Sequence, residues 1–214
     1  DDSFNIDLNR AGKILDLIVI KKLNISIQFS NGIRADRLNE RLVKKMKDAG
    51  TFMVGIGVES ASKNTLNQVK KNLDLAKIPA AVELLIKYRI LVWGFFMIGF
   101  LNETRKDIQN TVDFARRLKI HFASFSIVIA YPGTELFEAV KDRIDLDSYF
   151  SKRLNSCYPQ AQLTTLSFNE MRIIKKKALR RFYTPMRILR IAASIHSLKE
   201  VKFYFKKFRQ VILR

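Results

Sequence analysis

The feature that most constrains this sequence is the alternation of short apolar runs with amphipathic segments along its first two thirds. Each apolar run is rich in Ile, Val and Phe, which favours a buried strand of a parallel sheet. The segments between the runs repeat apolar residues every three or four positions, the spacing of one helix face. The repeated order of strand, loop and helix predicts an α/β fold. The four predicted strands lie at 25–30, 52–58, 90–98 and 122–130.

Start and stop signals support four helices in the same part of the chain, with stripes at 8–18, 38–49, 78–86 and 108–118. Asp36 is expected to cap the second helix, and Gly50 to end it. Thr104, with Asp107 three residues later, predicts the start of the fourth helix. Pro79 is expected to bend or shorten the third.

The pattern changes after residue 142, and we divide the chain there. Residues 143–166 look irregular and are predicted to be a connector, and 167–214 are predicted to be a basic helical region. Three helix starts are expected in this last region, because a capping residue is followed by a matching acid or proline. The pairs are Ser167 with Glu170, Thr184 with Pro185, and Ser197 with Glu200.

The net charge of +19 is concentrated near the C-terminus, where residues 170–214 hold 14 Lys or Arg and two acidic residues. The helix predicted at 198–213 gathers Tyr204, Phe205 and Phe208 on one face. This face either packs on the α/β unit or contacts an anionic membrane surface. Nucleic acid is a less favoured partner, because no RNA-binding module follows the sheet.

Cysteine and histidine usage limits what metal this chain can hold. Cys157 is the only cysteine, which excludes an internal disulfide and suits a reducing compartment. We therefore expect a cytoplasmic protein, in contact at most with a membrane surface. His121 and His196 lack a second ligand at metal spacing, so we assign this chain no metal ligand. No leader peptide and no apolar run of membrane-spanning length is visible.

Each predicted strand ends in a polar or glycine-bearing motif, and the C-terminal ends of parallel strands are where α/β folds bind ligands. Taken alone, each motif could equally be a helix cap or a turn. The motifs are D-D-S-F at 1–4, N-G-I-R-A-D at 31–36, G-I-G-V-E-S at 55–60, G-F-F-M-I-G-F-L-N-E-T at 94–104, and Y-P-G-T-E-L at 131–136.

In order and spacing, these motifs resemble the radical S-adenosylmethionine (radical SAM) superfamily, in particular the branch that often carries an N-terminal cobalamin-binding domain. The resemblance covers residues 1–140. It implies that residues 1–142 are part of a TIM-type barrel, strands 3 to 6 of a (β/α)6 core, followed by the α-helical tail. It also implies S-adenosylmethionine and a [4Fe-4S] cluster as cofactors, with cobalamin as a further one in that branch.

By matching position, the resemblance assigns cofactor contacts to seven residues. Asp1 and Asp2 would lie near the methionyl amino group. Arg34, together with Glu59 and Ser60, would face the carboxylate or the ribose, and Ile98 with Gly99 would border adenine. Glu103 is expected to cap the following helix instead.

Two departures from the family pattern stand out. The three cysteines of its C-x-x-x-C-x-x-C loop are absent, and we expect them upstream of a truncated N-terminus. Leu101-Asn102 replaces the usual Pro-Gly.

The resemblance predicts that the full-length protein cleaves S-adenosylmethionine reductively and acts on a small or lipid-like metabolite, with methyl transfer through cobalamin as one form of the reaction. An electron donor would be a partner, and the fragment alone would be inactive. Two alternatives stay open. One is a tRNA-modifying radical SAM enzyme, and the other is a non-catalytic degenerate barrel whose basic tail binds an anionic surface.

Overall fold

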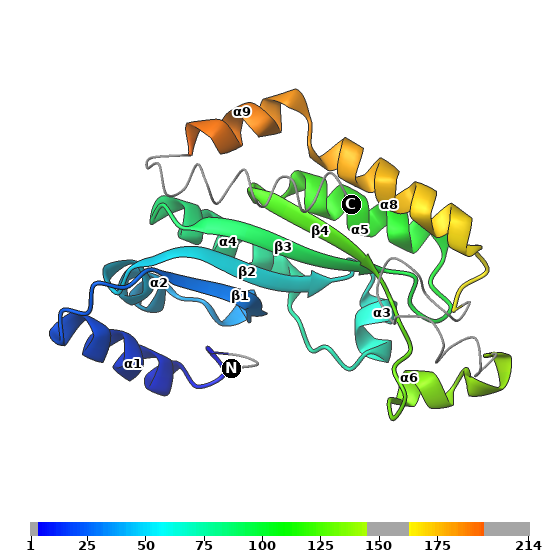
Figure 1. The fold of residues 1–214 in the computed structure, drawn as a ribbon, viewed down its shortest axis with the longest axis horizontal. Helices are drawn as coiled ribbons and strands as arrows, with labels where there is room; N and C mark the ends of the chain where they lie inside the picture. The colour runs from blue at the N-terminus through cyan, green and yellow to red at the C-terminus, as the bar shows by residue number, and fades with distance from the viewer. Residues whose placement is uncertain (1–3, 145–162, 195–214) are drawn as a thin grey trace.

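Four parallel strands form one sheet in the order β1-β2-β3-β4 in this computed structural model, which describes residues 4–144 and 163–194 (Figure 1). Because sequence order and spatial order agree, each strand is followed by a connection that returns to start the next strand beside it. This is the arrangement of a βα-barrel wall, and it confirms the predicted α/β class. The strands are β1 (Ile27–Ile33), β2 (Thr51–Glu59), β3 (Leu91–Ile98) and β4 (Phe122–Ile127).

Long helices connect and cover the strands. α1 (Leu8–Ile20) precedes β1, and α2 (Glu40–Asp48), α4 (Ile78–Lys87) and α5 (Arg105–Arg117) link successive strands. α8 (Phe168–Phe182) lies beside α5, and α9 (Pro185–Ala193) continues past its end (Figure 1). The shorter elements are α3 (Lys63–Gln68), α6 (Glu135–Glu138), and the 3-10 turns η1 (Ala35–Arg37), η2 (Leu75–Lys77) and η3 (Lys141–Arg143).

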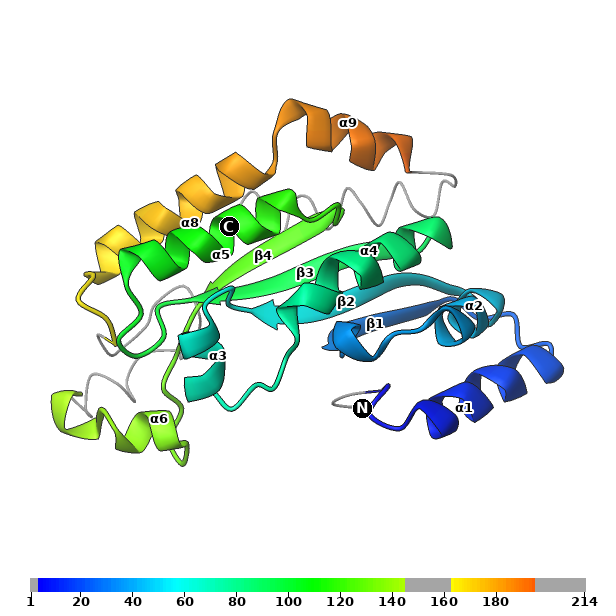
Figure 2. The same cartoon turned by 180° about the vertical axis from the view of Figure 1, so that it is seen from behind.

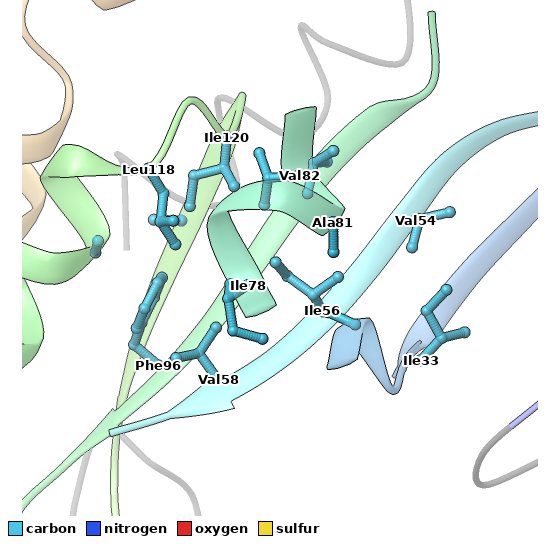
Figure 3. Packing of buried hydrophobic residues seen from close by; sticks show 14 of the residues in the cluster. Ile33, Val54, Ile56, Val58, Ile78, Ala81, Val82, Phe96, Leu118 and Ile120 are labelled. Atoms are coloured by element: carbon cyan, nitrogen blue, oxygen red, sulfur yellow. The ribbon is translucent and has the colours of Figure 1, made fainter. Parts of the chain in front are cut away.

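The main core lies between the sheet and its covering helices (Figure 3). Alternate residues of a strand point to opposite faces, so Val54, Ile56 and Val58 of β2 meet the apolar stripe of α4. Each large apolar side chain removed from water contributes on the order of 1.5–3 kcal/mol. The opposite face of β3 carries Trp93 and Phe95, which are only partly buried.

Local capping chemistry sets most helix ends as expected. Thr104 and Asp107 form a capping box at α5, and Ser167 with Glu170 forms another at α8. Gly50 follows α2 with a φ of 92°. Thr184 caps α9 as predicted, and the start predicted at Ser197 lies outside the described residues.

Two expectations about helix starts were wrong. Asn39, not Asp36, caps α2, because its side chain accepts from the Leu42 N–H while the Asp36 carboxylate is bound to Arg34. Pro79 neither bends nor shortens α4. It lies in the first turn, where a missing N–H costs no hydrogen bond.

The two edges of the sheet differ. At β4, the Tyr183 hydroxyl accepts from the Ala123 N–H and donates to the Ala123 carbonyl, both at 3.1 Å. This contact satisfies backbone groups on the outer side of β4. At the other edge, β1 pairs only with β2 among the described residues. None of the described helices is both long enough and apolar enough to cross a bilayer.

Candidate functional site

The C-terminal ends of β1 to β4 bring the predicted motifs to one edge of the sheet. α3 and α6 lie beyond this edge (Figure 2). We call this edge the strand rim, formed by residues 33–36, 59–62, 98–103 and 128–134. Parallel-strand folds place ligands here because the loops can vary while the strands hold them rigidly.

Glu59 ends β2 and forms an ion pair with a lysine of the following segment. Its Oε1 accepts from Lys71 Nζ at 2.5 Å, and the two side chains are only 22% and 24% exposed. Glu59 has a φ of 62°, a conformation that costs a residue with a Cβ free energy and clusters at functional sites. A Cβ at Gly57 would lie 2.9 Å from both charged atoms, so glycine leaves the space that this pair occupies.

Arg34 is held just after β1 by side-chain and backbone contacts. Its Nε and Nη2 bind the two oxygens of Asp36 at 2.9 and 2.6 Å, and Nη2 also donates to the Asn72 carbonyl. Burial raises the pKa of Asp36, but the Arg34 guanidinium outweighs this and keeps the pKa below its usual value. The fully buried Asn5 amide binds both the backbone N–H and the carbonyl of Arg34, at 2.9 and 2.7 Å.

Ser60 is fully buried, and its hydroxyl is engaged within the protein. Ser60 Oγ lies 3.2 Å from Thr111 Oγ1 of α5 and accepts from the Ser62 N–H at 3.1 Å. These bonds tie the end of β2 to the helix behind it. The cofactor contact assigned to Ser60 stays a prediction, and the structure gives its side chain a role in supporting the Glu59 turn.

Ile98 and Gly99 end β3 and begin the turn into α5. The Ile98 side chain is fully buried in the main core, so only its backbone is available to a ligand at the rim. Gly99 has a φ of 87°, and a Cβ there would lie 2.8 Å from Met171 Cε. The left-handed backbone turns the Gly99 N–H toward a buried carboxylate.

That carboxylate belongs to Glu103, and the expectation that Glu103 caps α5 was wrong. Glu103 Oε2 accepts from the Gly99 and Phe100 N–H groups at 2.6 and 3.2 Å, whereas Thr104 caps the helix. Glu103 immediately precedes the cap, so its side chain folds back over the turn that begins at Gly99. The side chain therefore braces the backbone turn after β3.

Burial makes Glu103 an unusual carboxyl group. Glu103 is only 3% exposed. Its Oε1 has no hydrogen-bond partner among the described residues. Desolvation raises the pKa of Glu103 to about 7, against the two backbone N–H donors, which lower it. Glu103 is thus held near the midpoint between its charged and neutral forms at neutral pH.

The strand rim brings together Arg34, Glu59, Ser60, Ile98 and Gly99, while Asp1 and Asp2 lie outside the described residues. Sequence reasoning did not assign roles to Asn5, Lys71 or Thr111. The sequence hint for Lys71 is its place in the segment after β2, where a cation can reach back to the strand end. Nothing in the sequence marks Asn5 or Thr111, since both act through tertiary hydrogen bonds.

The rim offers both an acidic and a basic group to a ligand. Glu59 can accept from hydroxyl or ammonium groups, and Arg34 can donate to a carboxylate. The described residues contain no group of three His, Cys, Asp or Glu side chains that could hold a metal. Cluster ligands are therefore not found in the described part of this chain.

Comparisons with known proteins show which family this sequence resembles. A family model described as the radical SAM superfamily matches residues 5–115. An uncharacterised methyltransferase of Pyrococcus horikoshii is 31% identical over 191 residues, which is 88% of this chain and 41% of the relative. The bacteriochlorophyllide d C-12(1)-methyltransferase of Chlorobaculum tepidum is 35% identical over 105 residues, 47% of this chain and 23% of the relative. The chain thus spans less than half the length of these relatives.

A solved structure supports the fold. The radical S-adenosylmethionine methyltransferase TsrM of Kitasatospora setae, with cobalamin and a [4Fe-4S] cluster bound, superposes with a TM-score of 0.56 at 19% identity. The match covers 65% of this chain and 29% of that one. The four parallel strands are accordingly part of a TIM-type barrel, which periodicity alone could not distinguish from an open sheet.

Proposed function

Because this chain belongs to the radical SAM superfamily, we propose that the complete protein binds S-adenosylmethionine over the strand rim and uses it in a methyl transfer. The observation that carries the proposal is the conformation and position of Glu59. It ends β2 in a strained backbone conformation and is held over Gly57 by Lys71. A strained, partly buried carboxylate at a strand end is positioned to bind rather than to stabilise the fold.

The proposed pose divides the cofactor between two charged groups. Glu59 accepts from ribose hydroxyls or the methionyl ammonium, and Arg34 donates to the methionyl carboxylate. The backbone from Ile98 to Phe100, braced by Glu103, borders the adenine. Ser60 supports the Glu59 turn through Thr111.

A [4Fe-4S] cluster, when bound, supplies the electron that cleaves S-adenosylmethionine in this family. Its ligands and an electron donor would come from outside the described residues, so no step through the cluster is assigned to this chain. Cobalamin as methyl carrier is part of the proposal. Its support is the cobalamin bound to the structurally similar methyltransferase.

We also propose that the substrate is a small, largely apolar molecule. Support comes from the partly buried Trp93 and Phe95 on the sheet face opposite α2, α4 and α5, whose rings lie 5.6 Å apart, and from a relative named for a bacteriochlorophyllide. A lipid-like substrate reached from a membrane surface through 198–213 stays a prediction, because those residues lie outside the described ranges.

The test is anaerobic reconstitution of the complete protein with iron, sulfide and cobalamin, followed by reduction in the presence of S-adenosylmethionine. The proposal predicts release of 5′-deoxyadenosine or S-adenosylhomocysteine above a control without reductant. A fully reconstituted protein that leaves S-adenosylmethionine intact and does not bind it would contradict the proposal and favour a non-catalytic barrel.

A further inference from the structure

An arginine-lined pocket lies at the end of the sheet opposite the strand rim. It has a volume of about 320 Å³ and is bordered by the last turn of α5, the end of α8 and the start of α9. Four arginines and one acidic residue line it, together with Phe182 and Thr184. Its charged lining is Arg116, Arg117, Arg181, Arg187 and Asp113.

Contacts within the protein balance only part of this positive charge. Asp113 Oδ1 is shared by two guanidinium groups, with Arg116 Nη1 at 3.2 Å and Arg181 Nη2 at 3.3 Å. Its Oδ2 accepts from Gln109 at 2.8 Å. The one carboxylate of the pocket is therefore fully engaged and leaves two arginines without an acidic partner there.

Arg187 is the more buried of these two arginines. Its Nη1 donates to the Leu118 and Ile120 carbonyls at 3.1 and 2.8 Å, and Nη2 donates to the Arg116 carbonyl at 2.7 Å. The guanidinium lies over the Phe182 ring, 4.0 Å from its centroid. Burial, and then the nearby charge of Arg190, lowers the pKa of Arg187 to about 10. Two of its five N–H donors remain for a further partner.

The contacts within the protein explain why Arg187 lies in the pocket, but they do not explain the excess of positive charge there. Carbonyl groups at the C-terminal end of a helix attract a cation, and Arg187 binds the Arg116 and Leu118 carbonyls at the end of α5. The side chain of Arg117, the last residue of α5, makes neither a hydrogen bond nor an ion pair in the described parts of the chain. Four positive charges against one carboxylate and the partial negative charge of a helix end leave the pocket cationic.

We propose that this pocket binds the phosphate group of a small anionic ligand, at a site separate from the strand rim. Phosphate fits because a guanidinium offers parallel N–H donors, and several of them can surround one tetrahedral anion. Arg117 and the unused donors of Arg187 supply the contacts, and Arg181 also lines the pocket. This inference does not depend on the proposed function, because no residue of the strand rim takes part.

The test is calorimetric titration of the complete protein with inorganic phosphate at constant ionic strength set by sodium chloride. We expect saturable binding that Arg117→Gln weakens by about tenfold, since one charge-assisted bond is lost. The Arg117 side chain is exposed and makes no hydrogen bond or ion pair in the described residues, so this variant tests the site without breaking a polar contact of the fold. Arg41→Gln, an exposed position on α2, is the matched control and should bind as the wild type does.

Further outcomes show whether the phosphate group belongs to a lipid or to a soluble ligand, and which results would overturn the proposal. Binding to phosphatidic acid vesicles that Arg117→Gln weakens identifies a lipid headgroup, and binding of inorganic phosphate without vesicle binding identifies a soluble ligand. The proposal is overturned by a lack of saturable phosphate binding or by equal weakening in the Arg41→Gln control. Retention of RNA by a protein that does not bind phosphate would also overturn it.

Discussion

The two ends of the sheet differ in how their charged side chains are balanced. At the strand rim, the partly buried ions are matched in pairs, Glu59 with Lys71 and Arg34 with Asp36. At the opposite end, four arginines line the pocket beside α5 with one carboxylate, Asp113, which pairs with only two of them. A zwitterionic ligand adds no net charge to a site whose ions are already paired, whereas an excess of cations calls for an anion from outside. The difference indicates a rim suited to a zwitterionic ligand and an opposite end suited to an anion.

Each end also has a buried titratable side chain, Glu103 at the rim and His121 at the opposite end, and burial shifts the two pKa values in opposite directions. It raises the pKa of Glu103 at the rim to about 7 and lowers the pKa of His121 at the opposite end to about 4. In both cases the neutral form is favoured. The Glu103 carboxyl braces Gly99, and His121 Nδ1 accepts from the Val92 N–H at 3.1 Å.

The largest expected difference between the two ends is in stability, and Glu103→Gln at the rim should show it. As pH rises from 4.5 to 7, the unfolded chain ionises Glu103 before the folded chain does, so the wild type loses stability over this range. Above pH 7 the accumulated loss is about 3 kcal/mol. Glutamine keeps an acceptor for the Gly99 and Phe100 N–H groups and cannot ionise. Urea unfolding at pH 8 should show the variant more stable than the wild type.

The control for that prediction is Glu103→Ala, which removes the acceptor as well as the charge. It leaves two backbone N–H groups unpaired, at about 1–3 kcal/mol each, and should be less stable than Glu103→Gln at every pH. If the two variants are equally stable, Glu103 does not brace the turn.

A smaller effect of opposite sign is expected at His121. The folded-state pKa lies below the ordinary value of 6.5, so the wild type loses stability as pH falls from 6.5 toward 4. The loss is about 2 kcal/mol between pH 6.5 and 5. His121→Asn should flatten this part of the stability curve while keeping an acceptor for Val92. An unchanged slope would show that His121 is not buried in its neutral form.

The smallest expected effect concerns the Glu59–Lys71 pair. The two side chains are partly exposed, so a double-mutant cycle with Glu59→Gln and Lys71→Met should give a coupling of about 1 kcal/mol. Thermal or urea unfolding of the four proteins supplies this value. A coupling of several kcal/mol would mean that the pair holds the fold together, and would weaken its assignment to ligand binding.

Sequence patterns predicted the strands and most caps because these depend on local chemistry. The strand predicted at 25–30 instead runs from Ile27 to Ile33. Register irregularities between Phe29 and Ile33 accommodate the polar Asn31-Gly32 step within β1, whereas the sequence pattern indicated this step as the end of the strand.

The site was predicted less completely, since its contacts join residues far apart in the chain. Arg34 and Glu59 were predicted from the strand-end motifs, but Lys71 contacts Glu59 from the far side of α3. Glu103 was assigned to the helix after it because a glutamate near a helix start usually acts as a cap. The φ of Gly99, which turns two N–H groups toward Glu103, is not visible in a sequence pattern.

The central claim is that Glu59 at the strand rim binds S-adenosylmethionine. The direct test measures S-adenosylmethionine affinity by equilibrium dialysis for the complete, reconstituted wild type, for Glu59→Gln and for the matched control Glu83→Gln. The control breaks the Glu83–Lys119 ion pair, of 2.8 Å, away from the rim. The account predicts that Glu59→Gln weakens binding by about tenfold or more, the loss of one charge-assisted hydrogen bond, while Glu83→Gln binds as the wild type does. Equal affinity of all three proteins would contradict it.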